Sequence, residues 1–249
     1  MRFSISRRSL SSAEERPGCE VAFMKTPGRR NTSDERKRLA ELEEFARSKG
    51  AYRARVFPSK GVTIDERVRM KCQIPLCPHY GRTLTCPPNV PTVDEFRKAL
   101  GNYRKALLIQ TRSSLSGEID SYDKEEVKRF FMNPAKTTQA KGGEGGGAQD
   151  DFSNVKIAAV RLHKLVNEVE GKAMSIGFPY ALGLIGGECM LCPACVGPCA
   201  SEGCRRPFEA RPSMEGVGID VLQTCVRAGL PFDMPPKTEI VWSGLLLID

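Results

Sequence analysis

Half of the cysteines in this chain gather in one short stretch, since five of the ten lie within sixteen residues. The five are Cys189, Cys192, Cys195, Cys199 and Cys204. The first three have two residues between neighbours, a spacing that lets one loop wrap a cubane iron–sulfur cluster. Structural zinc instead favours two cysteine pairs about a dozen or more residues apart. The stretch therefore predicts a 4Fe-4S cluster, with zinc as the alternative and disulfide pairing as the third choice.

A second, smaller cysteine group precedes this stretch and consists of Cys72, Cys77 and Cys86. Four prolines and a glycine accompany it, and they disfavour regular structure, so we expect a wrapped loop there. The two groups hold three and five cysteines, eight in all, which is the number of thiolates that two cubane clusters need.

The preferred assignment gives one cluster the four ligands Cys189, Cys192, Cys195 and Cys204. The early group would hold a second cluster, completed by Cys199 or by a ligand from outside the protein. The alternative for the early group is a zinc ion with His79 or Cys199 as its fourth ligand. Gly186 and Gly187 stand just before the late cysteines, and their backbone N–H groups are expected to donate to cluster sulfides. A plain turn is the other interpretation of these glycines.

Five further residues carry expectations of their own. Ser213 can cap a helix. Arg211 and Glu215, on either side of it, could instead bind a small substrate or partner near a cluster. His163 borders the apolar stripe of a helix and is expected to pack there. Cys225 lies in an amphipathic segment and is expected to be a small core residue.

Hydrophobic periodicity predicts a single metal-binding domain over residues 33–249, preceded by a disordered basic tail at 1–32. Helices are expected at 33–49, 92–100, 122–132, 152–176 and 214–228, and strands at 52–57, 105–110, 180–185 and 239–247. The glycine-rich segment 133–151 is interpreted as a flexible insertion. This order predicts an α/β or α+β fold in which a single sheet is flanked by helices and carries two cysteine-rich metal-binding loops.

The net charge of +8 suggests nucleic-acid binding, but its distribution argues against that interpretation. Half of it, +4, comes from residues 1–32, which hold seven Lys and Arg against three Glu. Basic residues near the cysteines would offset the negative charge of thiolate-bound clusters. No apolar run of about eighteen residues is present, so we expect no membrane span. With no export signal, the ten cysteines indicate a reducing compartment, the cytoplasm.

Two signatures in the chain resemble those of a known family. The early one comprises Arg69–Cys72, Pro75, Cys77, Tyr80–Gly81 and Cys86–Asn89. The late one comprises Gly187, Cys189, Cys192, Cys195, Cys204–Arg205, Pro207, Arg211–Glu215 and Gly218–Val221. Over about residues 35–247 the chain resembles the bacterial and archaeal predicted metal-binding proteins catalogued as domain of unknown function 2284. This resemblance implies metal binding and assigns no reaction. The segment near 142 and Cys199 depart from the family pattern, whose fourth late cysteine matches Cys204.

These observations favour a redox protein that carries one or two 4Fe-4S clusters and transfers electrons to or from a partner protein. Only two histidines are present, and no nucleophile–base motif is recognisable, so whether the protein is an enzyme stays open. One alternative is an enzyme or metal-delivery factor in which a three-cysteine site leaves one iron open. Another is a zinc-stabilised structural or binding module.

Overall fold

The computed structural model of the chain describes residues 32–125, 127 and 148–249. The tail expected at residues 1–32 falls outside the described residues except for Thr32, and so does most of the insertion expected at 133–151. Most of the helix expected at 122–132 also lies outside them.

Four strands form one sheet in the order β1-β2-β4-β3. They are β1 (Arg53–Pro58), β2 (Lys105–Ser114), β3 (Leu182–Ile185) and β4 (Glu239–Ile248). The two central strands pair along ten residues, from Lys105 opposite Ile248 to Ser114 opposite Glu239. All three pairings between these strands are antiparallel. The predicted single sheet flanked by helices is therefore confirmed, in its α+β form.

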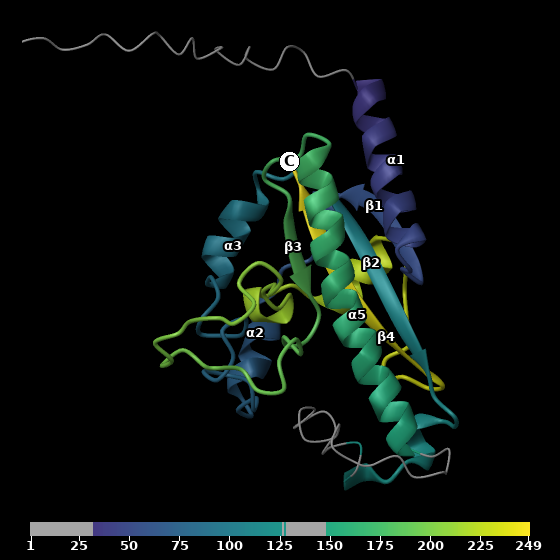
Figure 1. Ribbon diagram of the computed structural model, residues 1–249, viewed down its shortest axis with the longest axis vertical. Coiled ribbons are helices and arrows are strands. Elements are labelled where there is room, and N and C mark those ends of the chain that lie inside the picture. The colour runs from purple at the N-terminus through teal and green to yellow at the C-terminus, as the bar shows by residue number, and fades with distance from the viewer. Residues whose placement is uncertain (1–31, 126, 128–147) are drawn as a thin grey trace, which may run out of the picture.

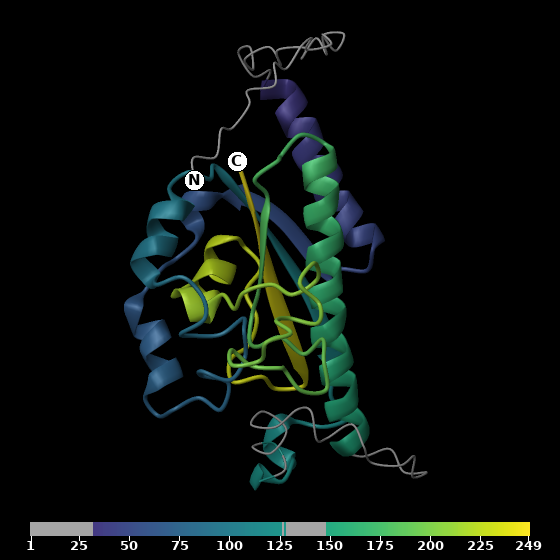
Figure 2. The same cartoon turned by 60° about the vertical axis from the view of Figure 1, so that its left-hand side comes forward.

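One face of the sheet is covered by the two longest helices, α1 (Thr32–Ser48) and α5 (Ala148–Ser175) (Figures 1 and 2). Apolar residues recur on one side of each helix at the spacing of an amphipathic helix. They pack with the sheet into one core cluster that includes Leu42, Ala46, Leu162, Val166, Leu107, Ile109, Leu246 and Ile248. This packing fixes both helices against the sheet.

The other face is covered by shorter elements, α3 (Val93–Leu100) and α6 (Val221–Arg227) (Figure 2). Its core cluster includes Phe57, Phe96, Ala106, Leu108, Met214, Ile219, Cys225, Leu245 and Leu247. Alternate residues of β2 and β4 serve the two clusters, as the two-residue period of a strand requires. The expectation that Cys225 is a small core residue is confirmed, since its side chain is 1% exposed.

Local signals placed several helix ends correctly. Thr92 precedes α3 and forms a capping box, in which its hydroxyl accepts from the Glu95 N–H and the Glu95 carboxylate accepts from the Thr92 N–H. The predicted starts and ends of α1, β1 and β4 lie within two residues of the observed ones. Short 3-10 turns link the main elements, namely η1 (Ser59–Gly61), η2 (Ile119–Ser121) and η4 (Glu215–Val217).

The single helix expected at 214–228 is wrong. The segment instead forms η4, followed by Gly218 with a φ of +89°, and then α6 capped by the Asp220 side chain. A left-handed residue cannot continue a right-handed helix, so the chain turns at Gly218. Ser213 does accept a hydrogen bond from the Gly216 N–H at 3.2 Å, but the residue directly before η4 is Met214, so Ser213 caps no long helix.

Three other boundaries also differ from expectation. Strand β2 runs four residues past its expected end at Gln110, to Ser114. Cys72 lies within a helix, α2 (Glu66–Gln73), whose first turn is capped by Asp65, so the early cysteine group is not a loop throughout. Residues 148–151 belong to α5 and not to an insertion. Asp151 is buried and accepts hydrogen bonds from Ser116 and Tyr122, which fixes this end of the helix.

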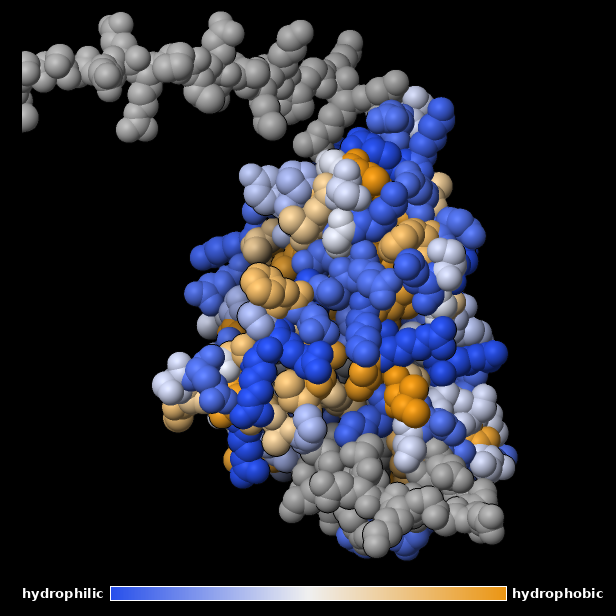
Figure 3. Space-filling view, viewed as in Figure 1, coloured by the Kyte–Doolittle hydropathy of each residue, from blue (hydrophilic) through white to orange (hydrophobic). Residues whose placement is uncertain are grey.

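Within the part of the chain that the structure describes, no helix combines the length and apolar character needed to cross a bilayer. Hydrophilic side chains cover most of the face seen in Figure 3, and apolar side chains appear there as separate patches. Among the large apolar side chains near the cysteines, those of Ile74, Leu76 and Phe208 have the highest exposed fractions.

Candidate metal centre

Four of the late cysteines share one cavity. Its lining comprises Cys189, Cys192, Cys195 and Cys204, together with Leu84, Thr85, Leu191, Val196, Arg205, Arg206 and Ala210. These four thiols are the ones assigned to the first cluster, three from their spacing and Cys204 from its match to the family pattern. Their mutual proximity also shows in electrostatics: burial, together with the charges of the other three thiols, raises the pKa of the Cys189 thiol to about 11.

The loop that carries these cysteines starts where β3 ends, at the edge of the sheet. Residues 186–204 form no helix or strand, and their course is set by turns. Gly187, Gly197 and Gly203 have φ values of +78°, +79° and +67°, which only glycine adopts without strain. The loop therefore reverses direction repeatedly within a short length and brings distant cysteines together.

Backbone donors serve two of the late thiols. The N–H of Arg206 donates to Cys204 Sγ at 3.4 Å, and the N–H of Leu191 stabilises the thiolate of Cys189. Such N–H donors to sulfur are the outer contacts that orient metal-bound thiolates and stabilise their charge. Sequence reasoning missed both donors, because they are backbone N–H groups and any residue type can supply them.

Gly186 and Gly187 were expected to supply these donors, but in the structure their N–H groups have other acceptors. The Gly186 N–H donates to the Ser243 carbonyl at 2.8 Å, and the Gly187 N–H donates to Glu215 Oε2 at 3.0 Å. A Cβ on Gly186 would lie 2.8 Å from the Ser243 oxygen, and one on Gly187 would lie 3.0 Å from the Trp242 ring. Close packing therefore explains both glycines.

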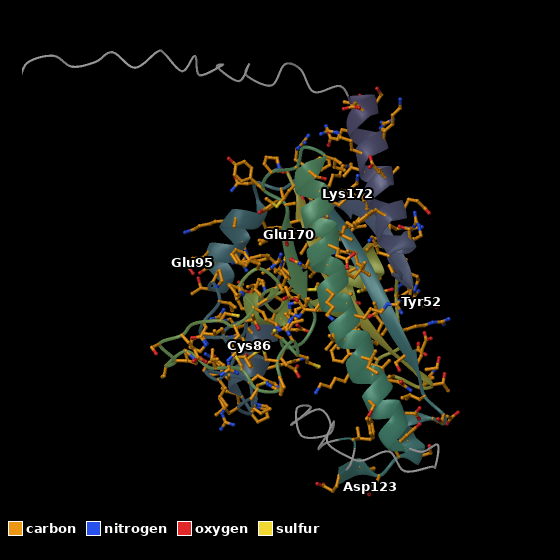
Figure 4. All side chains as sticks on the ribbon, in the orientation of Figure 1. Tyr52, Cys86, Glu95, Asp123, Glu170 and Lys172 are labelled. Atoms are coloured by element: carbon orange, nitrogen blue, oxygen red, sulfur yellow. The ribbon has the colours of Figure 1, made fainter. Side chains whose placement is uncertain are left out.

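The early cysteines form a second group beside α2. Cys86 is 5% exposed, and Figure 4 places it among the loops, away from α5. Burial raises its pKa to about 12; a hydrogen bond from Thr83 opposes this shift, and the charges of Glu188, Cys77 and Cys72 reinforce it. The Cys77 N–H donates to the Cys72 carbonyl at 3.0 Å, which ties the end of α2 to the loop. These three thiols therefore lie near one another, as predicted.

The two cysteine-bearing segments lie side by side. The Ser213 N–H donates to the Thr85 carbonyl at 2.9 Å, and Leu84 and Thr85 of the early segment line the late cavity. A Cβ on Gly197 would lie 3.4 Å from the carbonyl oxygen of Arg82. Residues more than a hundred positions apart thus form one region. The sequence alone did not predict that the two segments are in contact.

Cys199, the predicted fourth ligand of the early site, is exposed. It is not among the residues that line the late cavity. This agrees with its position outside the family pattern, and the structure gives no contact that joins it to the early cysteines.

His163 and Arg211 brace the late loop against α5. The Arg211 N–H donates to His163 Nε2 at 2.8 Å, and Arg211 Nε lies 2.8 Å from Glu170 Oε2. The guanidinium also donates to Asn167. His163 is 2% exposed, and burial together with the Arg211 charge lowers its pKa to about 4. The expected packing role of His163 is confirmed, and it includes a specific hydrogen bond.

Glu215 is likewise held by protein partners. It accepts from Gly187 and, at 3.1 Å, from the Ser213 hydroxyl, and burial raises its pKa. With Arg211 engaged by Glu170, neither charged group of this segment is available as a ready-made substrate clamp. Both instead connect the late loop to the domain.

Within residues 32–125, 127 and 148–249, no three His, Cys, Asp or Glu side chains gather closely enough to hold one metal ion. Thr85 Oγ1, buried beside the late cavity, lacks a hydrogen-bond partner among the described residues and could donate to a group bound there.

Comparison with known proteins identifies a family to which the chain is similar. No curated protein and no solved structure matches the chain significantly. The family described as predicted metal-binding protein (DUF2284) matches residues 55–248, a span that contains all eight clustered cysteines together with most of β1 and all of β2, β3 and β4. The chain therefore belongs to this family of predicted metal-binding proteins.

Proposed function

We propose that the protein binds one or two 4Fe-4S clusters and transfers electrons to or from a partner protein in the cytoplasm. The observation that carries the proposal is the late cavity, where four thiols from a closely spaced cysteine loop face one space. The donors are all sulfur, and two of them receive backbone N–H bonds. Beside them stands the buried Thr85 hydroxyl, which has no hydrogen-bond partner in the described part of the chain.

A bound 4Fe-4S cluster would take up and release single electrons. The chain would contribute the four thiolates, apolar walls from Leu84, Leu191 and Val196 that limit water, and the nearby charges of Arg205 and Arg206. Both arginines also pair with acidic neighbours, Glu202 and Glu209, so their charge is only partly available to offset that of the thiolates. The exposed rim of the loop would let a partner approach closely.

The test is anaerobic purification of the full chain with analysis of iron, acid-labile sulfide and zinc. We expect a brown protein with about equal iron and sulfide and at least about four irons per chain, bleached by dithionite with the appearance of an electron paramagnetic resonance (EPR) signal. A colourless protein with stoichiometric zinc would instead establish the structural-module alternative.

A second candidate function rests on the early group, which contains three cysteines, Cys72, Cys77 and Cys86. A three-thiolate cluster leaves one iron able to bind a small ligand, which suits an enzyme or a metal-delivery factor. Addition of small anions or thiols to the reduced protein distinguishes the two functions. A simple carrier keeps its EPR spectrum, whereas an open iron changes it.

A further inference from the structure

One contact crosses from the late segment to the early one. His79, between Cys77 and Cys86, has its Nε2 atom 3.5 Å from Oε1 of Glu188. Both side chains are largely buried, at 19% and 14% exposure. The Nε2 atom is fully buried, and within the described residues it makes no hydrogen bond. Buried imidazole nitrogens and carboxylates normally have hydrogen-bond or metal partners. At 3.5 Å, His79 and Glu188 do not supply a well-formed hydrogen bond to each other.

The position of Glu188 in the chain is equally specific. It directly precedes Cys189, whose thiol faces the late cavity, and it follows Gly187, whose N–H is held by Glu215. With both neighbours fixed, the Glu188 side chain reaches away from the late cavity toward the early cysteines. Its charge is among the causes that raise the pKa of Cys86, which supports this placement.

We propose that the Glu188 carboxylate is the fourth protein ligand of the early site, beside Cys72, Cys77 and Cys86, and that His79 donates to its second oxygen. This inference rests on the proposed function, because it requires that the early cysteines hold an iron–sulfur cluster. Metal-bound carboxylates are themselves commonly hydrogen-bonded, and the unbonded His79 Nε2 stands 3.5 Å from one oxygen of Glu188, so a small approach would make this bond.

Glu188 fits this position better than Cys199 does. Glu188 is mostly buried and contacts the early segment, whereas Cys199 is exposed. An oxygen ligand is harder than a thiolate and binds iron less tightly. The iron at this corner would therefore exchange its ligand more readily than the three thiolate-bound irons. This ligand assignment would also make Glu188 and Cys189 ligands of two different clusters, although the two residues are consecutive and their Cα atoms are about 3.8 Å apart.

The experiment compares four full-length variants purified anaerobically: Glu188→Ala, Glu188→Cys, His79→Gln and Cys199→Ser. We expect Glu188→Ala to lose about one iron per chain and to show the EPR signal of an oxidised three-iron cluster, with the late cluster intact. Glu188→Cys should keep all its iron and lower the reduction potential of the early cluster. His79→Gln should shift that potential with the iron retained, and Cys199→Ser should match the unmodified protein.

Three results would overturn the inference. Unchanged iron and EPR spectra in Glu188→Ala would exclude Glu188 as a ligand. Loss of the early iron in Cys199→Ser or His79→Gln, with Glu188→Ala unaffected, would assign the fourth position to that other residue. Iron loss in Glu188→Ala that Glu188→Cys does not restore would show a packing role only. Failure of the proposed function is separate, because an unmodified protein without iron would reveal it before any variant is made.

Discussion

Glu170 in α5 and Arg211, seven residues after the last clustered cysteine, form an ion pair of 2.8 Å whose side chains are only 15% and 12% exposed. Glu170 Oε2 also accepts the Gly183 N–H of β3 at 2.6 Å. One carboxylate thus joins the long helix, the edge strand that leads into the late loop, and the segment that leaves it. The late cavity is positioned by this junction rather than by the loop alone.

Replacement of Glu170 by alanine should therefore lower the free energy of unfolding by about 3 kcal/mol, because it leaves a largely buried guanidinium without its counter-charge. Urea denaturation monitored by circular dichroism measures this. The matched control is Lys172→Ala, which breaks the Lys172–Glu41 pair between α5 and α1, where the side chains are 27% and 50% exposed. That loss should stay below about 1 kcal/mol. If Glu170→Ala and Lys172→Ala lowered the free energy of unfolding equally, the Glu170 junction would not be a special source of stability.

His163 should make the protein less stable in mild acid. Its folded pKa of about 4 lies below the unfolded value of about 6.5, so the unfolded chain binds the proton first. The stabilisation is complete above about pH 6.5 and is lost as the pH falls toward about 4. Between pH 7 and pH 5 the loss should be about 2 kcal/mol. The variant His163→Gln keeps an acceptor for the Arg211 N–H, and its unfolding midpoint should fall less over this range. A parallel fall in both proteins would show that other groups dominate.

Gly187 and Gly203 allow backbone strain to be separated from packing. Both have positive φ, but a Cβ on Gly203 meets no atom within 4 Å, whereas one on Gly187 meets the Trp242 ring at 3.0 Å. That ring cannot move freely, since its Nε1 donates to the Val155 carbonyl at 3.1 Å. Gly203→Ala should cost about 1 kcal/mol, and Gly187→Ala at least about 1 kcal/mol more. Thermal unfolding of the two variants gives the difference, and similar melting temperatures would remove the packing argument.

Cys192→Ala should remove the late cluster and expose its loop. Because the loop has no helix or strand, much of its order depends on the group that the thiols bind. We expect about four irons fewer per chain and faster proteolysis between residues 186 and 212. Cys225→Ala is the control, as it removes a thiol that is buried in the core. Iron content should then stay unchanged. Equal iron in both variants would mean that the late cysteines are not the main site.

Sequence reasoning recovered the features that depend on local patterns. Leu39 and Leu42 recur at helical spacing in α1, Thr92 and Glu95 mark the start of α3, and the apolar strands of the sheet stand out. The spacing of Cys189, Cys192 and Cys195, with the family resemblance for Cys204, was enough to select the four cysteines that line one cavity. These signals are carried by residues that are close in the chain, so no tertiary information is needed to read them.

What escaped prediction depends on contacts between distant segments. The turn at Gly218 interrupts a stretch whose apolar residues otherwise suit a helix, because Val93 and the Asp65 N–H meet the chain there. The donors to the cysteine sulfurs are backbone groups of Arg206 and Leu191, which carry no sequence signature. The contact of His79 with Glu188 joins residues 109 positions apart, and the sequence around neither residue indicates it.

Strand β4 is the last strand along the chain, yet it lies inside the sheet between β2 and β3. A ribosome therefore completes both cysteine segments while the sheet that should support them still lacks an inner strand. Until residues 239–248 are made, β3 has no partner among these strands. The edge strand that carries the late cysteine loop therefore gains its support in the sheet only after β4 has joined it.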